Sequence, residues 1–126
     1  MGIEHQVVQV NQYELAGTPE AYVAAIRRLA ARTEQEGHSG VLQYRFHVNP
    51  SSRSAGAMIL YADADAWRLH HELAYEWAEM GELQSTVRLK RLILFGPLTS
   101  EVESWLTGSG ISYDHYPEAA AQFTRT

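Results

Sequence analysis

The pattern of hydrophobic and polar residues along the chain predicts strands and helices in alternation. Segments rich in β-branched and aromatic residues, often alternating with polar ones, are typical of strands. Segments of this kind are Val7–Leu15 and residues 41–48, 57–62, 89–95 and, shortest, 111–116. Apolar residues at helical spacing predict helices over Pro19–Glu36 and over residues 62–80 and 100–107. Gly81 is expected to interrupt the second of these helices, with residues 83–87 as a short continuation.

The order of these elements is β-α-β-β-α-β followed by a short helix and a short strand. It predicts an α+β fold of the ferredoxin-like, split βαβ kind. We expect one domain over residues 1–126, with a core at about 5–98 and a C-terminal extension at 99–126. Turn residues at Asn49-Pro50-Ser51 join the second and third strands as a hairpin.

The first and fourth strands carry apolar residues on both faces. Strand alternation gives residues 89, 91, 93 and 95 one face of the fourth strand, and Leu92 and Leu94 the other. Two helices can cover only one face of a four-stranded sheet, so the second face also needs a cover. We therefore expect a homodimer in which two sheets pack face to face.

Composition narrows the classes of function. The formal net charge of the 126-residue chain is −5, and no run of Lys and Arg occurs, which argues against a nucleic-acid partner. There is no cysteine, so disulfides, thiol nucleophiles and thiolate metal sites are excluded. No apolar run has the length of a membrane helix and no signal peptide is evident. The default location is the cytoplasm.

His70 lies at the centre of the apolar stripe of the helix predicted over residues 62–80. Ala66, Trp67, Leu73, Ala74, Trp77 and Met80 form this stripe, and His71 falls at its edge. A buried imidazole is either a hydrogen-bonded structural group or a general base that takes a phenolic or enolic proton. The sequence leaves both roles open.

Metal binding is not expected. His70 and His71 are consecutive and point about 100° apart on a helix, and the helix holds no His-x-x-x-His or Glu-x-x-His pair. No glycine-rich phosphate loop or nucleophile elbow is present either. The sequence therefore predicts no metal, haem, flavin or nucleotide cofactor.

Two stretches resemble the antibiotic-biosynthesis monooxygenase superfamily of dimeric α+β barrels. They are Gly40-Val41-Leu42-Gln43-Tyr44-Arg45, which opens the second strand, and the strand-then-helix segment over residues 60–70, LYADADAWRLH. The resemblance covers residues 5–98 and includes Gly96 at the end of the fourth strand. The resemblance implies a barrel-type homodimer. The superfamily includes cofactor-free oxygenases of quinols and aromatic polyketides, together with haem-degrading enzymes.

The resemblance also implies roles for particular residues. The cofactor-free branch places an acid or amide at the helix start, a Trp one turn later and an Arg on the fourth strand. Asp63 and Trp67 match the first two positions, and Arg88 or Arg91 matches the third, with Arg91 preferred as a charge within an apolar row. The haem-degrading branch has Asn, Trp and a late-helix His. Asn11 and Trp67 match that pattern, but Trp77 stands where the His belongs.

The resemblance thus implies a pocket between the second helix and the sheet, and His70, Trp67 and Arg91 are the catalytic candidates there. Arg91 would stabilise an enolate or superoxide there. The substrate-binding candidates are Asn11, Tyr44, Tyr61, Asp63, His71 and Trp77. We expect a cofactor-independent monooxygenase acting on a small aromatic or quinol-type molecule. The alternatives are a non-catalytic dimer that binds a small apolar ligand, and a haem-binding or haem-degrading protein.

Overall fold

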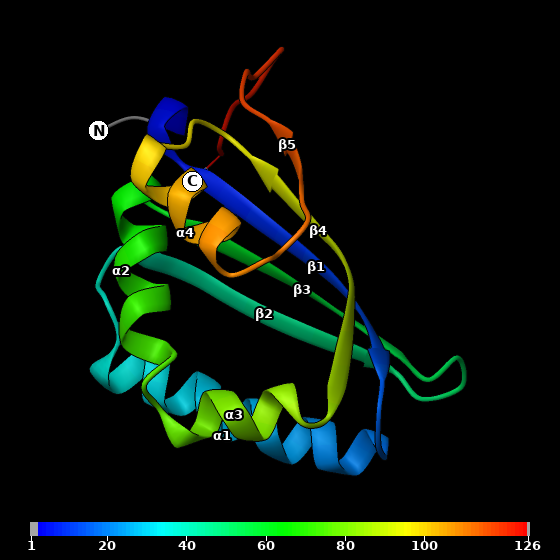
Figure 1. Cartoon of the computed structure of the whole chain (residues 1–126). Helices are drawn as coiled ribbons and strands as arrows, with labels where there is room; N and C mark the ends of the chain where they lie inside the picture. Colours follow the sequence, from blue (N-terminus) through cyan, green and yellow to red (C-terminus); the bar gives the residue numbers. More distant parts are fainter. Residues whose placement is uncertain (1–2, 126) are drawn as a thin grey trace.

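A computed structural model describes residues 3–125 as a five-stranded sheet with its helices on one face (Figure 1). The strands are β1 (Val7–Leu15), β2 (Val41–Asn49), β3 (Ser54–Tyr61), β4 (Val87–Phe95) and β5 (Asp114–Tyr116). The helices are α1 (Pro19–Glu36), α2 (Ala64–Ala74), α3 (Ala78–Gln84) and α4 (Ser100–Gly108), after a short 3-10 turn at Ile3–His5. Met1, Gly2 and Thr126, which complete the predicted domain, lie outside the described residues.

The strand order is β2-β3-β1-β4-β5, so β1 is the central strand. It pairs antiparallel with β3, Val7 opposite Tyr61, and with β4, Val8 opposite Phe95. The short β5 adds parallel to the outer edge of β4. The ferredoxin-like α+β fold predicted from the order of elements is confirmed, and α4 and β5 form the extension.

A β-bulge in β4 changes which side chains share a face. Gln12 pairs with Arg91 and Tyr13 with Leu89, so Lys90 is the extra residue. A bulge reverses the alternation on its two sides. The prediction that Leu89 shares a face with Arg91 is therefore wrong, because Leu89 turns toward the helices beside Leu92.

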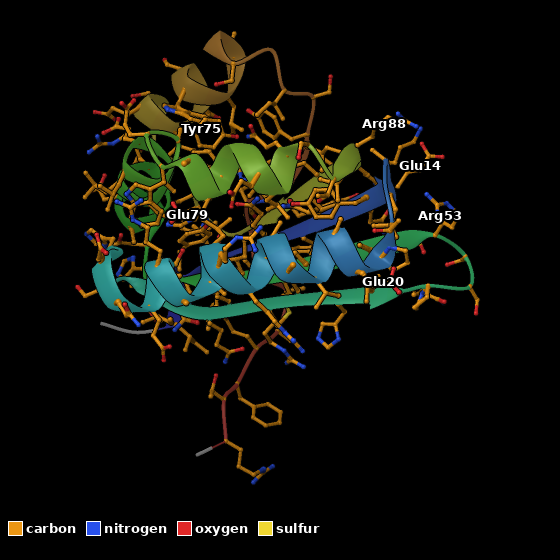
Figure 2. All side chains as sticks on the ribbon, turned by 90° about the horizontal axis from the view of Figure 1, so that it is seen from below. Glu14, Glu20, Arg53, Tyr75, Glu79 and Arg88 are labelled. Carbon is orange, nitrogen blue, oxygen red and sulfur yellow. The ribbon has the colours of Figure 1, made fainter. Side chains whose placement is uncertain are left out.

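The helix predicted over residues 62–80 is in fact two helices. The first, α2, ends at Ala74, and the second, α3, begins after Trp77, whose backbone is extended. Gly81 lies inside α3 rather than interrupting a helix. The break lets Trp77 bury itself beneath the Arg32 guanidinium, 4.7 Å from its ring centroid, and lets α3 pack along α1. Figure 2 shows α1 and α3 side by side with Glu79 between them, where it accepts a 2.9 Å hydrogen bond from Arg32.

The helices bury one face of the sheet and leave the other open. The covered face holds two clusters of buried residues, one around Trp67 and Tyr61 and one around Tyr22 and Leu29. The open face carries Val8, Val10, Met58, Leu60, Ile93 and Phe95, which are at least partly exposed. No helix within residues 3–125 has the length and hydropathy needed to cross a membrane.

Candidate functional site

A cavity of about 160 Å³ lies between the covered face of the sheet and the helices. The side chains around it are Gln9, Asn11, Tyr13, Tyr44, Phe46, Ile59, Trp67, His70, His71, Tyr75, Met80, Leu83, Gln84, Val87, Leu89, Leu92, Trp105, Leu106 and Ile111. Most are apolar or aromatic, as in sites for small organic molecules. Tyr75, Gln84 and Leu89 are exposed lining residues and mark where the cavity reaches the surface.

Helix α2 supplies the centre of the site. Asp63 caps its start by accepting a 2.8 Å hydrogen bond from the Ala66 backbone N–H, as expected of an N-cap aspartate. Trp67 comes one turn later and His70 and His71 about two turns later, and all three are buried. His71 was expected only at the edge of the stripe and Leu73 within it, yet Leu73 is 40% exposed. The buried stripe is rotated because α4 covers the His71 side of the helix.

His71 is held by two tryptophan rings and a backbone carbonyl. Its ring stacks on Trp67 with centroids 3.7 Å apart, and Trp105 of α4 approaches it edge-on at 5.3 Å. Its Nδ1 lies 2.8 Å from the Trp67 carbonyl oxygen. A carbonyl can only accept, so Nδ1 carries the proton and Nε2 is the unprotonated nitrogen of the neutral ring.

Burial keeps the His71 ring neutral. Desolvation, together with the neighbouring His70, lowers the pKa of His71 from 6.5 to about 3. The hydrogen bond to the Trp67 carbonyl acts in the opposite direction, because it favours the protonated ring. At neutral pH the site therefore holds an oriented imidazole with a lone pair on Nε2.

His70 has a different environment. Its ring lies against two tyrosine rings, Tyr44 at 5.6 Å and Tyr61 at 5.9 Å. Its Nδ1 is buried and has no hydrogen-bond partner in the described part of the chain. Burial, with a smaller effect of His38, lowers the pKa of His70 from 6.5 to about 4. The structural role considered for His70, a hydrogen bond to a carbonyl or a tyrosine hydroxyl, is thus not seen at Nδ1.

The opposite wall of the cavity is polar and comes from the central strand. Gln9, Asn11 and Tyr13 alternate along β1 and point to the covered face, where they are linked by side-chain hydrogen bonds. The Trp67 indole N–H donates to Gln9 at 2.8 Å and joins this row to α2. Sequence reasoning singled out Asn11 but missed Gln9 and Tyr13. The available signal was three polar residues at i, i+2 and i+4 on a face that the helices must cover.

The C-terminal extension also contributes to the cavity. Trp105 and Leu106 of α4, with Ile111 after it, line the cavity. Trp105 contacts the rings of Trp67, His71 and Tyr75 edge-on, with centroids 5.1 to 5.4 Å apart. Figure 2 shows Tyr75 between α3 and α4. The predicted helix over residues 100–107 gave no indication of this role, because the spacing within a helix does not say which element it packs on.

Five of the predicted site residues line the cavity together: Asn11, Tyr44, Trp67, His70 and His71. Tyr61 lies behind the two imidazole rings and donates a 3.4 Å hydrogen bond to Gln9. It is fully buried, and desolvation raises its pKa well above the ordinary tyrosine value. Tyr61 is therefore a supporting residue of the site rather than part of its surface.

The structure does not bring Arg91, Asp63 or Trp77 into the cavity. Arg91 lies on the open face, half-exposed, where its Nε donates to Asp114 of β5 at 2.9 Å. Its predicted role as an anion-stabilising group in the pocket is wrong, because that face of β4 points away from the helices. The Asp63 side chain caps the N-terminus of α2. Trp77 lies after the break between α2 and α3 and packs in the core cluster around Tyr22 and Leu29.

Metal ligands do not gather at the site. Over residues 3–125, no group of three or more His, Asp or Glu side chains comes close enough together to hold a metal ion. What the cavity offers is instead an array of aromatic rings, two neutral imidazoles and a row of amide and hydroxyl groups. Such an array can bind an aromatic molecule and accept a proton from it.

Comparisons with known proteins find likeness in structure alone. No family model and no curated protein matches the sequence. MupZ from Pseudomonas fluorescens has a TM-score of 0.76 at 17% identity, over 97% of this chain and 93% of MupZ. SnoaB, a cofactor-independent oxygenase from Streptomyces nogalater, has a TM-score of 0.59 at 18% identity, over 75% of this chain and 95% of SnoaB.

A protein from Caulobacter crescentus CB15, provisionally assigned as an antibiotic biosynthesis monooxygenase, has a TM-score of 0.58 at 18% identity. The structural match covers 87% of that protein and 73% of this chain. At these identities the likeness is one of fold. The chain has the fold of the antibiotic biosynthesis monooxygenase-like proteins.

Proposed function

We propose that this protein is a small cofactor-independent monooxygenase that acts on an aromatic or quinol-type molecule bound in the cavity. The observation that carries the proposal is His71, a neutral imidazole with an unprotonated Nε2, in an aromatic-lined cavity. Support also comes from the fold, which the cofactor-independent oxygenase SnoaB shares.

The chemistry starts with a proton transfer. A hydroxyl of the bound substrate gives its proton to His71 Nε2, which leaves an electron-rich phenolate or enolate. In an apolar cavity the attraction between this anion and the imidazolium is strong, which offsets the weak basicity of the buried ring. The anion then reacts with O2. One oxygen atom becomes a carbonyl of the product, the other leaves as water, and the substrate supplies all the electrons.

This proposal moves the base from His70 to His71. A general base needs a lone pair that is oriented by a second group. The Trp67 carbonyl provides that orientation for His71, whereas Nδ1 of His70 is enclosed and has no partner in residues 3–125. His70 then serves as part of the cavity wall. The haem-degrading alternative loses support, because Trp77, in the place of the late-helix His, lies outside the cavity.

Oxygen uptake by chelator-treated protein tests the function. The substrates are easily ionised hydroquinones and anthrones, and the spontaneous rate is subtracted. We expect uptake without added metal, haem or flavin, at a rate that is flat around neutral pH because the imidazole titrates far below it. No uptake above the spontaneous rate across the panel would favour a ligand-binding protein without catalysis. Uptake that appears only with added haem or metal would refute the cofactor-free mechanism.

We further propose that a second copy of the chain covers the open face of the sheet. Val10 lies at the centre of this face, with Met58 and Ile93 opposite it on the two neighbouring strands. Contiguous apolar surface of this kind marks an interface. In the homodimer the two sheets pack face to face, and the helices and their cavities lie on the outside.

Val10→Glu is expected to convert the dimer into a monomer, because a carboxylate would be buried without a partner at the centre of the interface. Light scattering at micromolar concentration should give twice the 14.2 kDa chain mass for the wild type and the single mass for the variant. Leu73→Glu, at an apolar side chain exposed on α2, is the matched control and should stay dimeric. A well-folded wild-type monomer would rule out this arrangement.

A further inference from the structure

The polar wall of the cavity is a chain of hydrogen bonds. Which group donates and which accepts in each bond follows from the groups at its start. It begins at Trp67, whose indole N–H can only donate. The Gln9 atom 2.8 Å away must therefore be the carbonyl oxygen, and Tyr61 donates to the same atom at 3.4 Å. With its oxygen assigned in this way, Gln9 presents its NH2 group to the next residue of the row.

The assignment passes along the strand from one amide to the next. Gln9 Nε2 lies 2.9 Å from Asn11, so the Asn11 atom there is the accepting oxygen. The Asn11 NH2 group then donates to the Tyr13 hydroxyl oxygen at 2.7 Å. Tyr13 is thus an acceptor toward Asn11, and its own hydroxyl hydrogen must point elsewhere.

No described residue accepts that hydrogen within hydrogen-bond distance, and Tyr13 lines the cavity. Burial raises the pKa of Tyr13 well above the ordinary tyrosine value, so the hydroxyl keeps its proton at physiological pH. Gln9 and Asn11 are 5% and 7% exposed. Burying two amides costs free energy unless they are hydrogen-bonded. If the row served only the structure, the hydroxyl at its end would be expected to have a protein acceptor for its hydrogen.

We propose that Tyr13 binds an oxygen atom of the ligand by donating its hydroxyl hydrogen, and that the ligand is therefore an aryl ketone or its enolate. The amide row holds the Tyr13 oxygen as an acceptor and so turns its hydrogen toward the ligand. His71 Nε2 accepts a hydrogen and Tyr13 donates one, which fits a molecule with a hydroxyl or acidic C–H and a carbonyl. The inference rests on the proposed function for the reaction, but it concerns binding and can be tested without turnover.

The test compares two bicyclic probes that differ in one carbonyl, α-tetralone and tetralin, by titration calorimetry without oxygen. The wild type is expected to bind α-tetralone more tightly. Tyr13→Phe should weaken α-tetralone binding about 2- to 10-fold, the loss of one neutral hydrogen bond, and leave tetralin binding unchanged. The carbonyl stretching frequency of bound α-tetralone should be lower in the wild type than in Tyr13→Phe. Tyr22→Phe, which removes a hydroxyl bonded to the His47 carbonyl outside the cavity, is the control.

A second variant keeps the tyrosine and reverses the hydrogen bond. In Asn11→Asp the carboxylate can only accept, so Tyr13 must donate to it and its hydrogen turns away from the cavity. The expected loss of α-tetralone affinity matches that of Tyr13→Phe. Equal affinity of the wild type for the two probes, binding of neither probe, or unchanged α-tetralone affinity in Tyr13→Phe would overturn the proposal. Binding through Tyr13 without oxygen uptake would instead refute the proposed function alone.

Discussion

His71→Leu is expected to lower the rate of oxygen uptake at least about 100-fold, the lower end for the loss of a general base. His70→Leu should lower it less than about 10-fold, because His70 contributes a wall of the cavity and not the base. Both residues are buried side chains of α2, and both replacements put leucine into an apolar setting. Comparing the two variants therefore distinguishes the loss of the proton-accepting nitrogen of His71 from the loss of any buried imidazole on α2.

Two measurements support the comparison. Thermal unfolding should show that His70→Leu is as stable as the wild type or more so, because it removes the buried Nδ1 that has no partner in residues 3–125. Nitrogen NMR of ¹⁵N-histidine-labelled protein should find the proton of His71 on Nδ1 at neutral pH. The reverse order of activities would assign the base to His70, and full activity in both variants would remove imidazole from the mechanism.

Acidification from neutral pH to about pH 4 is expected to destabilise the folded protein by about 3 kcal/mol through His70 alone. The unfolded imidazole takes up a proton near pH 6.5, whereas burial holds the folded His70 neutral until about pH 4. Between these values the unfolded state binds more protons, so the stability rises with pH. His71, with its pKa lowered to about 3, acts in the same direction.

Urea titrations at neutral pH and near pH 4, at one protein concentration, measure this effect. His70→Leu should remove a large part of the pH dependence, and the double variant with His71→Leu should remove more. A slope that stays the same in the double variant would show that the acid sensitivity arises from other groups.

The sequence by itself determined the elements and their order, because strand alternation and helical spacing are local properties. β1 and α1 begin and end at the predicted residues, and the predicted order identified the ferredoxin-like fold. It also placed Trp67, His70 and His71 on the second helix and Asn11 on the first strand. These positions follow from the residues on each element, without reference to what the element contacts.

Only the tertiary structure decided how those residues work together. The helix breaks after Ala74 because Trp77 gains burial beneath Arg32 of α1, a contact between distant parts of the chain. The bulge at Lys90 depends on the pairing of β4 with β1, and it places Leu89 at the cavity while Arg91 stays on the open face. The direction of the hydrogen bonds along β1, and with it the free hydrogen of Tyr13, follows from the bond that the Trp67 indole of α2 donates to Gln9, a contact between residues far apart in the sequence. Periodicity carries no information on such partners, because it does not specify which elements pack together.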